Sequence, residues 1–285
     1  MAPTMAVPPS PGRPAARSLM GGHVRSASVP CHHSHPLLMH VDDQLRALRS
    51  WTCNPGQNPL SLAHVRALLC VLDELLHLPL AQGALARGAA ACADGLLDGF
   101  LVLADAFGSF LAALLALRQH ASELRAAVRR RDAAKLASAA RAQRQAAKEL
   151  EQLAAAAARE AARCARASLQ ASAAAELEVA RTVAEAINDT AVASASVFLE
   201  VGSVADAAVT LAVAPSSSKK QRLTLVNGSS RSKTPASEEQ REFMALEKLQ
   251  ELEQCIGELE SESEKVFRSL VQTRVSLLNI HTPTF

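Results

Sequence analysis

Aromatic residues are scarce in this chain of 285 residues. Phe, Trp and Tyr together make up 3% of it, with one Trp and no Tyr. Strands favour β-branched and aromatic side chains, whereas the alanine and leucine that supply most of the 49% hydrophobic content favour helices. Neither an alternating strand pattern nor a repeat of domain size occurs. The sequence therefore predicts an all-α fold, a bundle of long antiparallel helices.

Paired cysteines and an apolar leader are also missing. The cysteines show no Cys-x-x-Cys spacing, which is typical of a reducing compartment with single, mostly buried thiols. The N-terminus lacks the apolar core of a secretory signal, and its early prolines would spoil an amphipathic presequence. We therefore expect an intracellular protein, cytoplasmic and/or nuclear, rather than one imported into an organelle. The six cysteines are Cys31, Cys53, Cys70, Cys92, Cys164 and Cys255.

Common catalytic motifs do not occur in this sequence. Gly-x-Ser-x-Gly, Gly-x-Gly-x-x-Gly and the Gly-Lys-Ser/Thr phosphate-binding loop are all absent. Asp94 and Asp98 lie one helical turn apart, as acid pairs do. Because Gly95 and Gly99 stand beside them, we interpret the two acids as capping and loosening the start of a helix. The sequence predicts no catalytic residue, no cofactor and no enzymatic activity.

One cluster near the N-terminus has the chemistry of metal ligands. Zinc requires about four ligands held in tetrahedral geometry, and this cluster lacks paired spacing and stands in a Pro-rich stretch. We therefore predict no specific metal site. The cluster comprises Cys31, His32, His33, His35 and His40.

The chain has neither a strong net charge nor an uninterrupted membrane-spanning run. A net charge of +2 predicts no dominant polyanion partner. The Arg run at 129–131 lacks neighbouring aromatic groups, so we expect no specific nucleic-acid binding. Asp98 and Asp105 interrupt the most apolar stretch, 96–117, and the remainder is shorter than the roughly 20 residues that a span needs. We predict no transmembrane segment.

Composition divides the chain into four regions. Residues 1–34 are rich in Pro, Ser and Arg and are predicted to be a disordered tail. Residues 35–214 are predicted to form the helical bundle, and 215–237 a flexible polar linker. Residues 238–285 are predicted to be a C-terminal helix that packs on the bundle. The expected helices cover 41–50, 61–77, 80–91, 94–131, 132–170, 176–213 and 238–280.

The clearest pattern in the chain is a seven-residue repeat of apolar side chains between 249 and 280. Two neighbouring rows place these side chains on one side of a helix, which then needs a helical partner. Ser263 and Thr273 interrupt the rows, and Arg274 is expected to hydrogen-bond or pair at their edge. The predicted helix seam comprises Leu249, Leu252, Ile256, Leu259, Val266, Leu270, Arg274, Leu277 and Ile280.

The distribution of charge suggests where this helix packs. Residues 118–166 contain twelve Lys or Arg and five acids, whereas 238–268 contain ten acids and four bases. A basic neighbour would relieve the repulsion along the acidic row, so we predict docking near Arg129 to Lys148, although two solvated surfaces would carry the same charges. The need to cover the seam favours an intramolecular clasp over an open coiled-coil surface. The acidic row is Glu247, Glu251, Glu258 and Glu262.

A short motif near the N-terminus suggests regulation by phosphorylation. Arg25, Ser28 and Pro30 fit the Arg-Ser-x-phosphoSer-x-Pro pattern that 14-3-3 adaptors bind through an Arg cluster. Arg25, three residues before Ser28, also suits a basophilic kinase. We therefore expect a 14-3-3 adaptor as a partner when Ser28 is phosphorylated.

Several segments together resemble a plant-specific family, the domain-of-unknown-function 241 proteins, also called BYPASS-like or BPS1-type. They include Arg-Ser-Ala-Ser-Val-Pro at 25–30, Leu-Leu-His-Leu-Pro-Leu at 75–80, Glu-Leu-Arg-Ala-Ala-Val-Arg-Arg-Arg at 123–131 and Leu-Val-Gln-Thr-Arg-Val-Ser-Leu-Leu-Asn-Ile at 270–280. In order and spacing they cover nearly the whole chain. The chain departs from the family pattern at Cys31-His32-His33 and in the Ala-rich segment after the Arg run, which has no Tyr.

The resemblance implies an all-helical, non-enzymatic plant protein linked to root and shoot development. It supplies no substrate, cofactor or catalytic residue. We expect an interaction or scaffold protein that binds unidentified protein partners through helix–helix contacts. The alternative is a peripheral membrane protein that uses the basic Ala-rich helix against anionic lipid, although that helix has a thin apolar face.

Overall fold

The computed structural model describes residues 35–56, 58–171, 177–213 and 236–282, which all lie in one unit, His35–Phe285. These residues form seven α-helices and, within the described ranges, no strand, which confirms the all-α class. The sequence-based boundaries agree closely with most of these helices. The helices are α1 (Pro36–Cys53), α2 (Ala63–Leu76), α3 (Pro79–Arg87), α4 (Ala90–Arg130), α5 (Ala133–Ala171), α6 (Leu177–Val213) and α7 (Ala236–His281).

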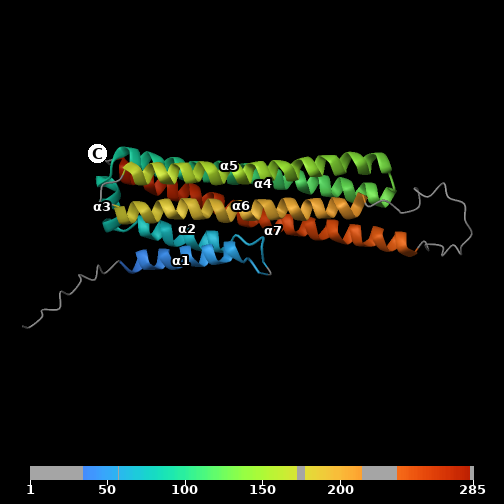
Figure 1. Cartoon of the computed structure of the whole chain (residues 1–285), viewed down its shortest axis with the longest axis horizontal. Coiled ribbons are helices and arrows are strands. Elements are labelled where there is room, and N and C mark those ends of the chain that lie inside the picture. Colours follow the sequence, from blue (N-terminus) through green and yellow to red (C-terminus); the bar gives the residue numbers. More distant parts are fainter. Residues whose placement is uncertain (1–34, 57, 172–176, 214–235, 283–285) are drawn as a thin grey trace, which may run out of the picture. The chain divides into compact units, whose positions relative to one another are not determined.

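Four long helices make up most of this unit. Helices α4, α5, α6 and α7 contain 41, 39, 37 and 46 residues, so each is roughly 55–70 Å long at about 1.5 Å per residue. They run side by side and alternate in direction along the chain (Figure 1). Helix α7 therefore returns along α4, which confirms that the C-terminal helix folds back onto its own chain.

The shorter helices cover one half of this bundle. Helices α1 and α2 form a hairpin that packs on α6 and α7, and Pro79 begins α3, which bends away from α2 by 80°. Helix α1 begins at Pro36 rather than at the predicted residue 41. His35 explains the earlier start, because its Nδ1 accepts a hydrogen bond from the Leu37 backbone N–H at 3.2 Å and caps the first turn.

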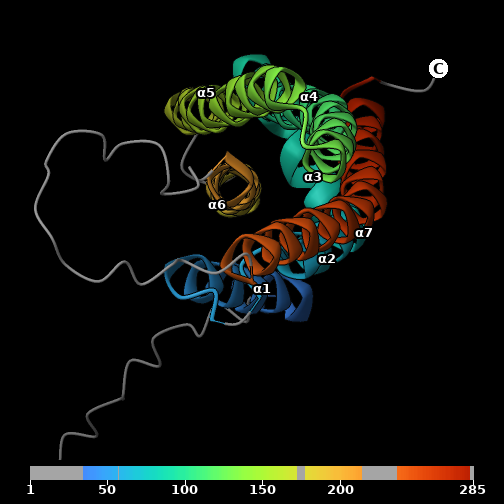
Figure 2. The same ribbon diagram turned by 90° about the vertical axis from the view of Figure 1, so that its right-hand side faces the viewer.

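Helix α6 lies at the centre of the packing. It packs against α5, α4, α1 and α7, and an end-on view shows it among these helices (Figure 2). Three fully buried rings join it to α4: the centroid of Phe198 lies 4.0 Å from that of Phe110 and 5.5 Å from that of Phe107. This cluster holds most of the few aromatic side chains of the described core.

Two glycines allow α4 to approach α5 and α6 closely. A Cβ on Gly95 would clash with the hydroxyl of Ser168 and lie 3.2 Å from its backbone N, and a Cβ on Gly99 would lie 2.9 Å from Ile187. The expectation that these glycines loosen a helix start is therefore wrong. Helix α4 already begins at Ala90, and the missing side chains permit tight packing in its interior.

A turn of two residues joins α4 to α5. Arg131 has a positive φ of 51°, and the following Asp132 N–H donates to the carbonyl of Ala127 at 3.1 Å, which closes the end of α4. The Asp132 carboxylate then accepts from the backbone N–H groups of Ala134 and Lys135 and caps α5. This turn fixes the antiparallel register of α4 and α5.

Candidate functional site

The predicted seam faces the interior of the protein. Seven of its apolar side chains are fully buried, and Ile280 is half-buried against the core. Helix α7 packs on α4, α2 and α6, so these helices cover the seam. The seven buried side chains therefore offer no open surface to another chain. The buried seven are Leu249, Leu252, Ile256, Leu259, Val266, Leu270 and Leu277.

Polar side chains at and beside the seam form hydrogen bonds within the chain, except that the buried hydroxyl of Ser263 has no partner among the described residues. Arg274 Nε donates to the backbone carbonyl of Leu97 at 3.3 Å, at the edge of the seam. Thr273 is fully buried and donates to the carbonyl of Ser269 at 2.9 Å. Ser276, which lies outside the predicted seam, donates to Asp73 of α2 at 3.1 Å. Short hydroxyl side chains thus fit the buried face without breaking the helix.

A row of ion pairs joins α7 to α4 beside the seam. Arg118 pairs with Glu260 at 2.5 Å, Arg125 with Glu253 at 2.8 Å, and Arg131 with Glu242 at 3.0 Å. The first two pairs are spaced by seven residues in each helix and run in opposite directions, as antiparallel packing requires. The row lines the edge of the α4–α7 contact.

The predicted docking place for α7 is therefore only partly right. The arginines that pair with α7 lie at positions 118, 125 and 131, mostly before the predicted stretch 129–148. Helix α5 packs chiefly on α4 and α6, and its Arg144 lies 3.6 Å from Asp206 of α6. The net charge of a segment does not show which side of the bundle its helix occupies, so the sequence placed α7 too near α5.

The acidic row of α7 finds its cations nearby. Glu262 pairs with Arg66 of α2 at 2.8 Å and with Lys265 at 2.8 Å. Hydrogen bonds from Lys265 and from Arg66 lower the pKa of Glu262 below its usual value. Glu251 pairs with Lys248 at 2.9 Å on the same helix. Local cations and α2, rather than α5, thus offset much of the repulsion.

Several other predicted residues cannot be compared with the structure. Arg25, Ser28 and Pro30 of the phosphorylation motif lie outside the described residues, as do Cys31, His32 and His33. His35 caps α1, and His40 lies on its exposed side. Within the described ranges, no group of three or more His, Cys, Asp or Glu side chains is arranged to hold a metal ion.

A row of exposed apolar side chains runs along the outer side of the α4–α7 contact. Leu115 is 59% exposed, and Leu101, Val271 and Val275 are each about two-fifths exposed. Three of them lie near the Arg274–Leu97 bond: Leu101 is one turn after Leu97, and Val271 and Val275 are within one turn of Arg274. We call these four residues the outer α4–α7 face.

This face was not predicted from the sequence. Helix α4 is apolar on nearly all sides between 99 and 117, and a helix of this kind is usually buried all round. The heptad pattern of α7 identifies only its inward side. The available signal was the pair Val271 and Val275, two β-branched apolar residues outside the seam rows.

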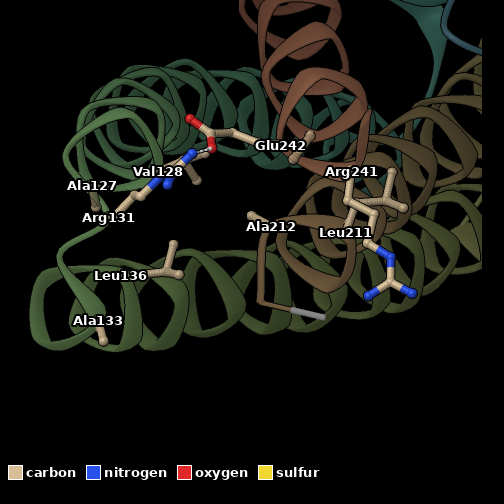
Figure 3. Close-up of a pocket in the computed structure, with 10 residues that line it drawn as sticks. Ala127, Val128, Arg131, Ala133, Leu136, Leu211, Ala212, Arg241 and Glu242 are labelled. Atoms are coloured by element: carbon tan, nitrogen blue, oxygen red, sulfur yellow. Dashed lines mark hydrogen bonds and ion pairs between the residues drawn. The ribbon is translucent and has the colours of Figure 1, made fainter. Parts of the chain in front are cut away.

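A pocket of about 320 Å³ lies at the end of the bundle that contains the α4–α5 turn. Its walls are mostly apolar, and include Val128, Leu136 and Leu211 from three different helices. Arg131, paired with Glu242, and Arg241 stand on opposite sides of it (Figure 3). The pocket combines an apolar lining with two guanidinium groups.

Two helices of the described chain, α4 and α6, are long and apolar enough to cross a membrane by length and composition. The bent pair of α2 and α3 would count as a third. The bundle buries 44% of the most apolar window of α4 and 39% of that of α6. More than half of each window is therefore not fully buried in the bundle.

A family comparison matches most of this architecture. The family model described as "Protein BPS1" matches residues 61–280, from the residues just before α2 almost to the end of α7. The chain belongs to the BPS1 family. Membership of the BPS1 family suggests a role related to plant development. Helix α1 and the motif at 25–30 lie outside the matched range. Searches of curated proteins and of solved structures found no match.

Proposed function

We propose that this BPS1-family chain is a non-enzymatic interaction or scaffold protein in root and shoot development. It would act inside the cell, in the cytoplasm and/or nucleus, through helix–helix contacts with protein partners. Its seam is occupied by its own helices, so a partner must use another surface. The outer α4–α7 face carries this proposal, because it offers four exposed apolar side chains on two adjoining rigid helices.

The chemistry of that face suits an apolar partner helix. The charged groups next to it pair with each other: Arg118 with Glu260 at one end, and Glu264 with Arg268 on α7. A partner would therefore bury apolar side chains without having to neutralise a strong charge. The shallow groove between two antiparallel helices is a common place for an amphipathic helix to bind.

Crosslinking mass spectrometry or proximity labelling in root and shoot tissue tests this proposal. The wild-type chain should label a defined set of proteins, and L101Q/V271Q should lose most of them. The matched control is V192Q/L199Q, which changes two similarly exposed apolar residues on α6. Loss of the same partners in both variants, or in neither, would contradict a role for the outer α4–α7 face.

The 14-3-3 partner requires a separate test. A phosphorylated peptide of residues 20–35 should bind a 14-3-3 protein, and the same peptide without phosphate should not. A reference phosphopeptide serves as the positive control. If the reference binds and the phosphorylated 20–35 peptide does not, Ser28 is not a 14-3-3 site.

We propose that α4 and α6 stay in the bundle rather than in a bilayer. Asp98 and Asp105 within α4 would each oppose insertion by roughly 2.5–3.5 kcal/mol at the bilayer centre. Phe107, Phe110 and Phe198 form a packed core between the two helices. Extraction of cell membranes with alkaline carbonate should therefore release any bound protein.

A further inference from the structure

Three chain segments meet at the pocket end of the bundle. The α4–α5 turn, the last turn of α6 and the first turns of α7 line the same pocket (Figure 3). The pair Arg131–Glu242 joins the end of α4 to α7, so α4 ends near the level of Glu242. Phe243 and Met244, the next residues of α7, therefore lie at this end of the bundle.

Basic side chains predominate on this end. Arg129 and Arg130 are exposed and form no ion pair with any described residue, and the same holds for Arg241. Of the nearby acids, Glu242 pairs with Arg131 and Asp132 caps α5, while Glu238 and Glu239 belong to the first turn of α7.

Large apolar side chains are exposed on the same end. Phe243 is 66% exposed and Met244 50% exposed, directly after Glu242 on α7. Leu211, near the end of α6, is 41% exposed and lines the pocket. Helix α5, which the sequence suggested for lipid contact, has no exposed large apolar side chain among its described residues.

We propose that this basic and apolar bundle end docks on the surface of an anionic lipid bilayer. Anionic lipid attracts clustered Lys and Arg, each contributing about 1 kcal/mol near the surface. A peripheral protein also needs apolar side chains that enter the interface, and Phe243 and Met244 supply them. Arg131 and Arg241, on opposite sides of the pocket, can hold a phosphate of a lipid headgroup.

Vesicle flotation of the full chain tests the proposal. The protein should float with phosphatidylcholine vesicles that contain about 30% phosphatidylserine, and not with phosphatidylcholine alone. R129Q/R130Q should weaken binding about 25-fold, since each charge contributes about fivefold. The matched control R159Q/R166Q removes two exposed charges from the other end of α5 and should bind as the wild type does.

The apolar part of the surface has its own variant. F243S/M244S should also lose most binding at unchanged charge, whereas V192S/L199S on α6 should not. An equal loss of vesicle binding in R129Q/R130Q and in its control R159Q/R166Q would overturn the proposal. Flotation of the wild type with phosphatidylcholine alone would do the same. Membrane binding that survives alkaline carbonate would also overturn it. So would a wild-type protein that binds an acidic polyglutamate peptide but does not float with the vesicles.

Discussion

The two long contacts of α4 are built differently. On the side of α5, small residues face each other: Gly95 and Gly99 on α4, and Cys164 and Ser168 on α5. On the side of α7, large aliphatic side chains such as Leu270 form the core, with a row of ion pairs at the edge. The α5 contact gains stability from close approach of the backbones, whereas the α7 contact gains it from buried side-chain area.

The largest effect is expected where a large side chain is removed from the α7 contact. Leu270 is fully buried, so L270A should destabilise the protein by about 2–5 kcal/mol through lost burial and a cavity. The comparison variant A161G on α5 should cost only about 1 kcal/mol, mainly through helix propensity. Urea unfolding followed by circular dichroism measures both. Equal losses would contradict the difference between the two contacts.

Adding one methyl group to α4 should instead be costly at the α5 contact. In G95A the new Cβ would meet Ser168 and lie 3.3 Å from the carbonyl of Cys164, so we expect about 1–3 kcal/mol of destabilisation. Gly108 lies in the same helix with nothing within 4 Å of its Cβ position. G108A should therefore stabilise by about 0.5–1 kcal/mol. Thermal unfolding of both variants measures these changes in stability. A G95A protein as stable as the wild type would show that α4 and α5 can move apart.

A smaller effect is expected from the ion pairs. The Arg125 and Glu253 side chains are only 30% and 20% exposed, so a double-mutant cycle with R125Q and E253Q should give a coupling of about 0.5–1 kcal/mol. The exposed pair Arg163–Glu160 on α5 should give about 0.3 kcal/mol. A coupling for Arg125–Glu253 no larger than for this pair would mean that the row adds little to the α7 contact.

The smallest effect concerns pH. The pKa of Glu262 is lowered in the folded protein by Lys265 and Arg66, so its ionised form favours folding. This contribution is present above the pKa of the unfolded chain and is lost as the pH falls through the folded pKa. E262Q should therefore lose stability near pH 7 but little near pH 3, compared with the wild type. Urea unfolding at both pH values measures this, with E258Q as the exposed control.

Local patterns in the sequence predicted the helices well, because apolar spacing, proline and alanine content act over short distances. The inward side of α7 followed from the heptads of Leu249 to Leu277, and so did its need for a partner. The sequence did not show which helix covers this side of α7. Arg118 and Arg144 look alike in sequence, yet Arg118 pairs with α7 and Arg144 lies beside α6.

The glycines and the exposed surfaces were harder to predict. Gly95 and Gly108 lie in the same helix, and only the position of Ser168 shows that one is required and the other is not. Leu101 and Leu103 are both leucines in one apolar run, yet one lies on the outer α4–α7 face and the other in the core. Such differences depend on contacts between residues far apart in the chain.

The two-residue turn at Arg131 and Asp132 also bears on how the chain folds during synthesis. Helices α4 and α5 can pair as soon as both have left the ribosome, because little loop entropy is lost. Helix α7 reaches α4 only after α5, α6 and the residues between α6 and α7 have been made. The side of α4 that α7 covers therefore stays open until translation is nearly complete. We expect chaperones to bind the nascent chain at this stage, and chains that terminate early to aggregate.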